Sequence, residues 1–151
     1  MGADSVLISL NRFGEALSLK VGGEPAIDEA NGDFRETSLE GAVTEMTRLD
    51  VLLFEQNNMA VPCLKTADGS FYRAPLAEGG IIQVELGPAA EVKSVQIGDT
   101  ALTGPTGRVG EDPLEGLITG TGGCNVLRFT MQGRRCICIT LPDGRLLITC
   151  T

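Results

Sequence analysis

The chain has 151 residues, of which 42% are hydrophobic, so it is long enough for one ordinary domain or two small ones and too apolar for a disordered segment. Its net charge of −8 disfavours binding to DNA, RNA or an anionic membrane, since these partners attract basic surfaces. The chain contains no histidine, which excludes histidine-based triads, metal sites and pH switches.

The first half of the chain predicts short strands joined by tight turns. Apolar and polar residues alternate over short stretches, which is typical of strands with one buried face. Twenty glycines and seven prolines favour many turns and few long helices. The expected strands are Val6–Leu10, Leu17–Val21, Val51–Gln56, Met59–Thr66 and Ser70–Ala74.

The second half predicts the same series of strands. In each half a glycine-rich connection follows the first two strands, and in the first half this connection begins after Val21. The expected strands are Ile81–Leu86, Val92–Ile97, Val126–Met131, Arg134–Leu141 and Arg145–Cys150. Each half is therefore expected to open with a hairpin and to end in a three-stranded meander.

Asp-Gly pairs mark the last hairpin of each half, at Asp68-Gly69 and Asp143-Gly144. A two-residue type I′ turn there would pair Ala67 with Ser70 and Pro142 with Arg145. The meander also needs an earlier turn. Asn57-Asn58 supplies it in the first half and Gln132-Gly133 in the second.

A helix is the alternative over Leu39–Phe54, where the apolar spacing is ambiguous. Its counterpart Leu114–Phe129 contains Gly120, Gly122 and Gly123, which disfavour a helix. We apply the same conclusion to the first copy. The glycine run itself has no following lysine or helix start, as a phosphate-binding loop requires, and is interpreted as a flexible loop or tight bend.

The similarity of the halves is an internal duplication. Shifted by 75 residues, the segment from Gly23 to Pro75 matches the second half without a gap, and 14 of the 53 pairs are identical. Leu39-Glu40-Gly41 recurs as Leu114-Glu115-Gly116. A period of this length that occurs only twice indicates a duplicated domain. We expect an all-β protein of two similar small antiparallel β sandwiches or open barrels, residues 1–76 and 77–151, that pack on each other around a pseudo-twofold axis.

Glu40 and Glu115 are candidate residues because both lie in the repeated Leu-Glu-Gly. Catalytic carboxylate pairs need unequal environments, whereas equivalent repeats offer similar ones, so we expect an interface or turn role. Arg134 and Arg135 form the single basic doublet, at an expected hairpin tip, and are candidates for contact with an acidic neighbour. With no catalytic set in the sequence, we expect neither an enzyme nor a cofactor.

The five cysteines, an odd number, favour reduced thiols. Cys136 and Cys138 share one face of an expected strand. The two-residue turn would pair Cys150 with Ile137 and direct it to the opposite face, so we expect core packing and no metal site. The first ten residues carry Asp4 and no basic stretch, which predicts no secretory signal. We expect a reducing compartment, the cytoplasm or a plastid stroma.

The duplicated β architecture resembles that of lattice-forming shell proteins, including the pyrenoid shell proteins of diatoms, which have two similar regions. The resemblance rests on the duplication and assigns no site residue. It implies self-assembly into a shell around a carbon-fixing condensate, with copies of the same chain and another protein at the enclosed face as partners. A viral capsid decoration protein fits the same description. A tandem β module that binds a protein is the alternative from a different class.

Overall fold

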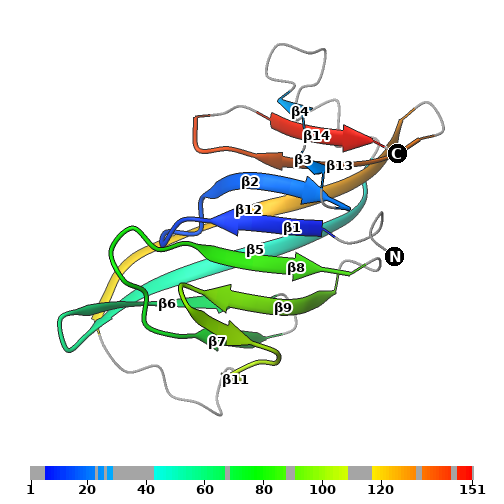
Figure 1. Ribbon diagram of the computed structural model, residues 1–151. Coiled ribbons are helices and arrows are strands. Elements are labelled where there is room, and N and C mark those ends of the chain that lie inside the picture. Colours follow the sequence, from blue (N-terminus) through cyan, green and yellow to red (C-terminus); the bar gives the residue numbers. More distant parts are fainter. Residues whose placement is uncertain are drawn as a thin grey trace.

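A computed structural model describes residues 6–22, 24–25, 27–28, 43–66, 69–87, 91–108, 117–131, 134–143 and 146–150 (Figure 1). All regular structure in these ranges is antiparallel β-strand, which confirms the expected all-β class. None of their residues belongs to a helix that is long and apolar enough to cross a membrane. The strands are β1 (Val6–Leu10), β2 (Ala16–Val21), β3 (Glu24–Pro25), β4 (Ile27–Asp28), β5 (Val43–Gln56), β6 (Met59–Lys65), β7 (Ser70–Arg73), β8 (Ile82–Leu86), β9 (Val92–Ile97), β10 (Thr100–Leu102), β11 (Gly107–Arg108), β12 (Leu117–Met131), β13 (Arg134–Thr140) and β14 (Leu146–Cys150).

The described strands form two sheets that lie face to face. Sheet A has the strand order β10-β9-β8-β1-β2-β3, and sheet B has the order β11-β7-β6-β5-β12-β13-β14-β4. Both sheets cross the expected boundary at residues 76 and 77, through the β1–β8 and β5–β12 pairs. The two parts of the chain therefore build one shared sandwich, and neither part closes a sandwich of its own.

The register is symmetric about two central residue pairs. In sheet A, Ile8 pairs with Val84, its counterpart at a shift of 76 residues. In sheet B, Leu49 pairs with Cys124, its counterpart at a shift of 75. The neighbouring strands occupy equivalent positions as well. In sheet A, β9 and β2 lie next to the central β8–β1 pair, and in sheet B, β6 and β13 lie next to the central β5–β12 pair. This arrangement is the one that an internal repeat around a pseudo-twofold axis predicts.

The main core lies between the two sheets. It includes Ile8 and Val84 from sheet A and Leu49, Leu64 and Val126 from sheet B, all fully buried or nearly so. β2 of the first half contacts β13 and β14 of the second half. Each end of the sandwich therefore combines sheet A strands from one half with sheet B strands from the other.

Two smaller apolar clusters lie on the other face of sheet B, since successive residues of a strand point to opposite faces. The first consists of Phe54, Val61, Cys63 and Phe71. The second consists of Phe129, Cys136, Cys138, Leu146 and Ile148. Four members of the second cluster are the counterparts of the first at a shift of 75, so the two clusters repeat each other.

The expected turn at Asn57-Asn58 is confirmed. Gln56 pairs with Met59, and both asparagines have positive φ, of 50° and 65°. Positive φ at both central residues defines a type I′ turn, and asparagine tolerates this conformation better than most residues. The helix considered over Leu39–Phe54 is absent from its described part, residues 43–54, which belongs to β5.

The register predicted for the Asp-Gly hairpins is wrong by one residue. Lys65 pairs with Phe71, and Thr140 with Leu146, so a longer loop replaces the two-residue turn. In the first half the Gly69 N–H donates to the Thr66 carbonyl at 3.1 Å, and Gly69 has a φ of 89°. These features belong to a three-residue loop in which glycine takes the left-handed position, a loop that Asp-Gly also favours.

The register also corrects the prediction for Cys150. This residue lies opposite Cys136, where the two-residue turn would have placed it opposite Ile137. Cys136 is disulfide-bonded, whereas Cys63, Cys124 and Cys138 keep their thiols and form no disulfide. The prediction of reduced thiols therefore holds for these three cysteines and is wrong for Cys136.

The glycine run at 120–123 is not the expected flexible loop or tight bend, because it lies within β12 and pairs with β5. The loop between β1 and β2 crosses it closely. A side chain at Gly122 would overlap the carbonyl oxygen of Phe13, and one at Gly14 would lie 2.9 Å from Val51. Glycine is needed here because backbone approaches backbone.

We expect Gly122→Ala to lower the free energy of unfolding by about 1–3 kcal/mol, because the added methyl group must displace the β1–β2 loop. Gly104→Ala is the matched control. No heavy atom lies within 4 Å of the position that its Cβ would take, and its effect should stay within about 0.5 kcal/mol. Chemical denaturation of both variants measures the difference, and equal values would contradict the close approach of Phe13.

Candidate functional site

Most of what the sequence predicted for the site residues concerns parts of the chain that the structure does not describe. Glu40 and Glu115 lie outside the described residues. Arg134 and Arg135 begin β13, where they pair with Met131 and Thr130 of β12, and their side chains also lie outside the described part. Their predicted interface role stays a prediction.

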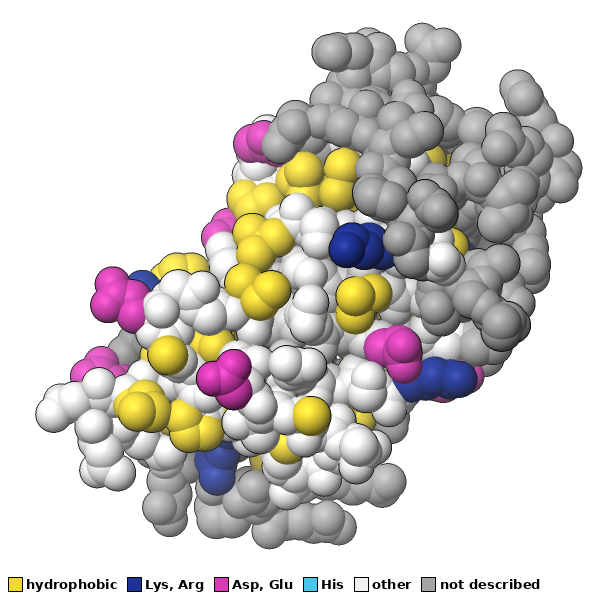
Figure 2. Space-filling view, in the orientation of Figure 1, with side chains coloured by type: hydrophobic (Ala, Val, Ile, Leu, Met, Phe, Trp, Pro, Cys, Tyr) yellow, Lys and Arg dark blue, Asp and Glu magenta, His cyan; other side chains and the backbone are white. Residues whose placement is uncertain are grey.

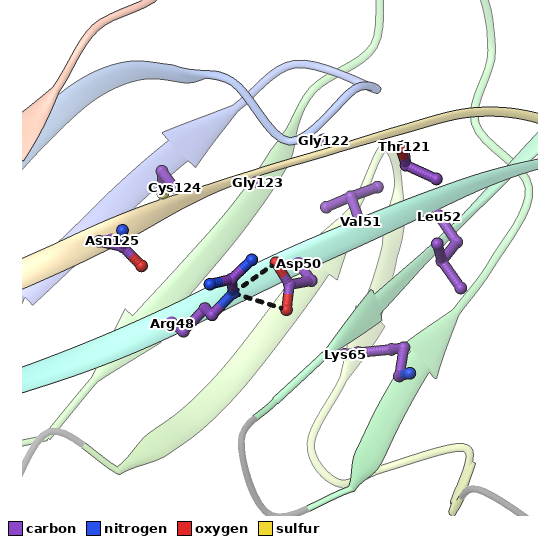
Figure 3. A pocket seen from close by; sticks show the side chains of 10 residues that line it. All are labelled: Arg48, Asp50, Val51, Leu52, Lys65, Thr121, Gly122, Gly123, Cys124 and Asn125. Carbon is purple, nitrogen blue, oxygen red and sulfur yellow. Dashed lines mark hydrogen bonds and ion pairs between the residues drawn. The ribbon is translucent and has the colours of Figure 1, made fainter.

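A polar groove of about 470 Å³ lies instead at the centre of sheet B, where β5 pairs with β12 (Figure 3). We call it the axial groove because the central Leu49–Cys124 pair lies beside it. Its polar lining residues are Arg48, Asp50, Lys65, Thr121 and Asn125. Leu49, Val51 and Leu64 point into the core, so their neighbours Arg48, Asp50 and Lys65 face away from sheet A.

Asp50 occupies the middle of a row of three charges. The Arg48 Nε donates to both carboxylate oxygens of Asp50, at 3.0 and 3.1 Å. Lys65 of β6 is the cross-strand neighbour of Asp50. The side chains of Arg48 and Asp50 are 65% and 42% exposed, so water screens this ion pair and it contributes little to stability.

Gly123 leaves the groove open on the β12 side. It lies opposite Asp50 in the register. A Cβ at Gly123 would overlap the Leu49 carbonyl and lie 2.9 Å from Oδ1 of Asp50. The missing side chain therefore lets β12 pass close to β5 and leaves space beside the Asp50 carboxylate.

The axial groove breaks the symmetry of the repeat. Adjacent pairs keep their character, as in Val51 and Val126 or Leu52 and Leu127, whereas Arg48 corresponds to Gly123 and Lys65 corresponds to Thr140. Both cations therefore come from the first half. Comparison of the halves could have revealed this difference, but it could not show that β5 and β12 are neighbours.

Cys124 lies among the residues that line the groove, but its side chain packs against the main core, on the same side of sheet B as its cross-strand partner Leu49. Burial, and to a smaller extent the nearby Asp50 carboxylate, raise its pKa from 9.0 to about 12. The thiolate is the reactive form of cysteine, so this thiol is a poor nucleophile at neutral pH. The groove can thus bind a ligand but holds no activated cysteine.

No group of three or more His, Cys, Asp or Glu side chains placed to hold a metal ion occurs within the described ranges. The expectation of no metal site had rested on Cys150 facing away from Cys136, and the observed register removes that reason.

A second concavity of about 400 Å³ lies between the β1–β2 loop and the β5–β6 hairpin. We call its surroundings the Phe13 patch, defined by the lining residues Arg12, Phe13, Leu53 and Ala60. The Arg12 guanidinium lies 5.0 Å from the centre of the Phe13 ring. Phe13 is 37% exposed, which is high for a large apolar side chain.

Comparison of the chain with known protein families, curated proteins and solved structures finds no match.

We expect the raised pKa of Cys124 to make stability depend on pH in the alkaline range. As the pH rises from 9.0 towards 12, the unfolded thiol loses its proton while the folded thiol keeps it. The stabilising contribution is therefore complete below pH 9.0 and declines above it, by at most about 1.4 kcal/mol per pH unit. Urea denaturation of the wild type and Cys124→Ala across this range measures the contribution, and identical pH profiles would contradict it.

Proposed function

We propose that the protein is a non-catalytic structural protein that self-associates into an extended shell, coat or lattice. The symmetric strand order is the observation that carries this proposal. One end of the sandwich combines β8–β10 with β5–β7, and the other combines β1–β3 with β12–β14 (Figure 1). A chain with two similar ends can bind a neighbour at each of them, and such contacts extend without limit when the symmetry operation does not close.

The sheet edges favour contacts through faces and loops over strand addition. The outermost described strands are β3, β4, β10 and β11, and each has only two or three residues. Pro25 in β3 also lacks a backbone N–H. Very short edge strands and edge prolines are features that limit uncontrolled edge-to-edge pairing.

The Phe13 patch is the best-supported contact surface for this association. Burial of the exposed part of Phe13 against a second copy would remove apolar surface from water, which is the main driving force in association. Figure 2 shows further apolar side chains scattered among polar ones over the face of sheet A that it presents. Enclosure of a carbon-fixing condensate follows from the shell-protein resemblance alone, and the geometry bears on self-association only.

A binding module is the second candidate, and the axial groove favours it. The groove is polar and concave, and it breaks the repeat symmetry, which a purely structural repeat does not require. A binding module would stay monomeric or dimeric at protein concentrations at which a lattice protein forms large assemblies.

Static light scattering over a concentration series tests the proposed function. We expect the mean mass to rise far above the 15.9 kDa of one chain, with sheets, tubes or large particles in negative-stain micrographs of the same samples. A monomer at every concentration would contradict self-association.

Phe13→Ser tests the contact surface. Loss of the part-exposed aromatic ring should raise the concentration needed for assembly by roughly tenfold, from the apolar area that an interface would bury. Ile81→Ser, which removes an exposed apolar side chain outside the Phe13 patch, is the control. If both variants assemble like the wild type, the patch is not the interface.

A further inference from the structure

The axial groove contains more hydrogen-bond donors than its own residues use. Arg48 makes its two hydrogen bonds to Asp50 through Nε, so the terminal nitrogens of its guanidinium are not engaged by Asp50. Among the described residues, Lys65 forms no ion pair and no hydrogen bond through its ammonium group. The groove therefore offers a guanidinium and an ammonium group to a ligand.

The strand register brings these two donors within reach of one ligand. Lys65 lies opposite Asp50, and Arg48 is two residues from Asp50 on the same face of β5. Arg48 and Lys65 are thus diagonal neighbours across the β5–β6 pair, whose Cβ atoms are typically about 7–8 Å apart. Both side chains are long enough to reach one ligand beside the Asp50 carboxylate that lies between them, and both lie along the groove in Figure 3.

The local charge is opposite to that of the whole molecule. Two cations and one carboxylate line the groove, whereas the chain carries 20 acidic and 12 basic residues. The guanidinium fork matches the spacing of two oxygens on a carboxylate or phosphate group, and an ammonium adds a compact positive charge. Asn125 and Thr121 place an amide and a hydroxyl group on the β12 side of the same groove.

From these observations we propose that the axial groove is a binding site for an oxyanion, a phosphate or carboxylate group bound by the Arg48 guanidinium and the Lys65 ammonium beside the Asp50 carboxylate. Asp50 holds the Arg48 guanidinium in place through its Nε, and the open space beside Gly123 widens the groove on the side away from Lys65. The site exists once per chain, because the corresponding positions in the other half are Gly123 and Thr140. This proposal does not depend on self-association, since it concerns a surface other than the ends of the sandwich.

Titration of the full-length ¹⁵N-labelled protein with inorganic phosphate and, separately, with glutarate tests the site by NMR. We expect saturable shifts of the backbone amides at 48–50, 65 and 121–125, with a dissociation constant on the order of 1 mM for so open a site. The better of the two ligands identifies the class of oxyanion. Shifts that stay linear, or that spread over the whole surface for both ligands, would overturn the proposal.

Charge-removing variants locate the binding. Arg48→Gln and Lys65→Gln should each weaken binding at least about tenfold, because each removes one of the two cations that face the anion. Lys93→Gln, which removes an exposed lysine from β9 of sheet A, is the matched control and should change the affinity less than about twofold. The far-UV circular dichroism of each variant checks that it is folded. Equal affinities in all three variants would show that the anion binds elsewhere.

Discussion

The antiparallel pairing of β5 with β12 is the interaction on which the rest of the structure depends. These strands have 14 and 15 residues, far longer than their neighbours, and their ladder joins the two halves of the chain at the centre of sheet B. Leu49 and Cys124 meet at the middle of the ladder and pack against the core between the sheets. Because β6–β7 extend from one side of this pair and β13–β14 from the other, the position of every outer strand of sheet B follows from it.

The glycines of β12 connect this fold to the candidate site. Alternate residues of a strand point to opposite faces, so neighbouring glycines serve different surfaces. Gly122 faces the β1–β2 loop and permits the approach of the Phe13 carbonyl, whereas Gly123 leaves space beside Asp50 in the axial groove. The same short run therefore allows the loop to cross one face of β12 and opens the groove on the other. A side chain at Gly122 would displace the loop, whereas one at Gly123 would disturb both the pairing of β12 with β5 and the surface beside Asp50.

Local chemistry predicted much of the fold, and long-range pairing accounts for what it missed. The Asn57-Asn58 turn and the meander strands follow from residues a few positions apart, which the sequence displays directly. The Asp-Gly hairpins were placed one residue out of register, since Asp-Gly suits both a two-residue turn and a three-residue loop with a left-handed glycine. This shift of one residue changes the cross-strand partner of Cys150 from Ile137 to Cys136. The axial groove could not be predicted, because it requires Asp50 and Gly123 to be neighbours although 73 residues separate them.

The repeat symmetry divides the surface of the molecule into two kinds of site. Features away from the axis, such as the apolar clusters around Phe54 and Phe129, occur twice. Beside the axis, where β5 pairs with β12, each residue lies opposite the counterpart of one of its own neighbours in the chain. A difference between the halves therefore makes this surface asymmetric and leaves the outer strands undisturbed. Asp50 and Gly123 are such a pair: the carboxylate that binds Arg48 lies where a side chain on β12 would otherwise approach it, and glycine leaves that space free. A site on the axis can therefore acquire its own binding chemistry while both ends keep the matched shapes that self-association needs.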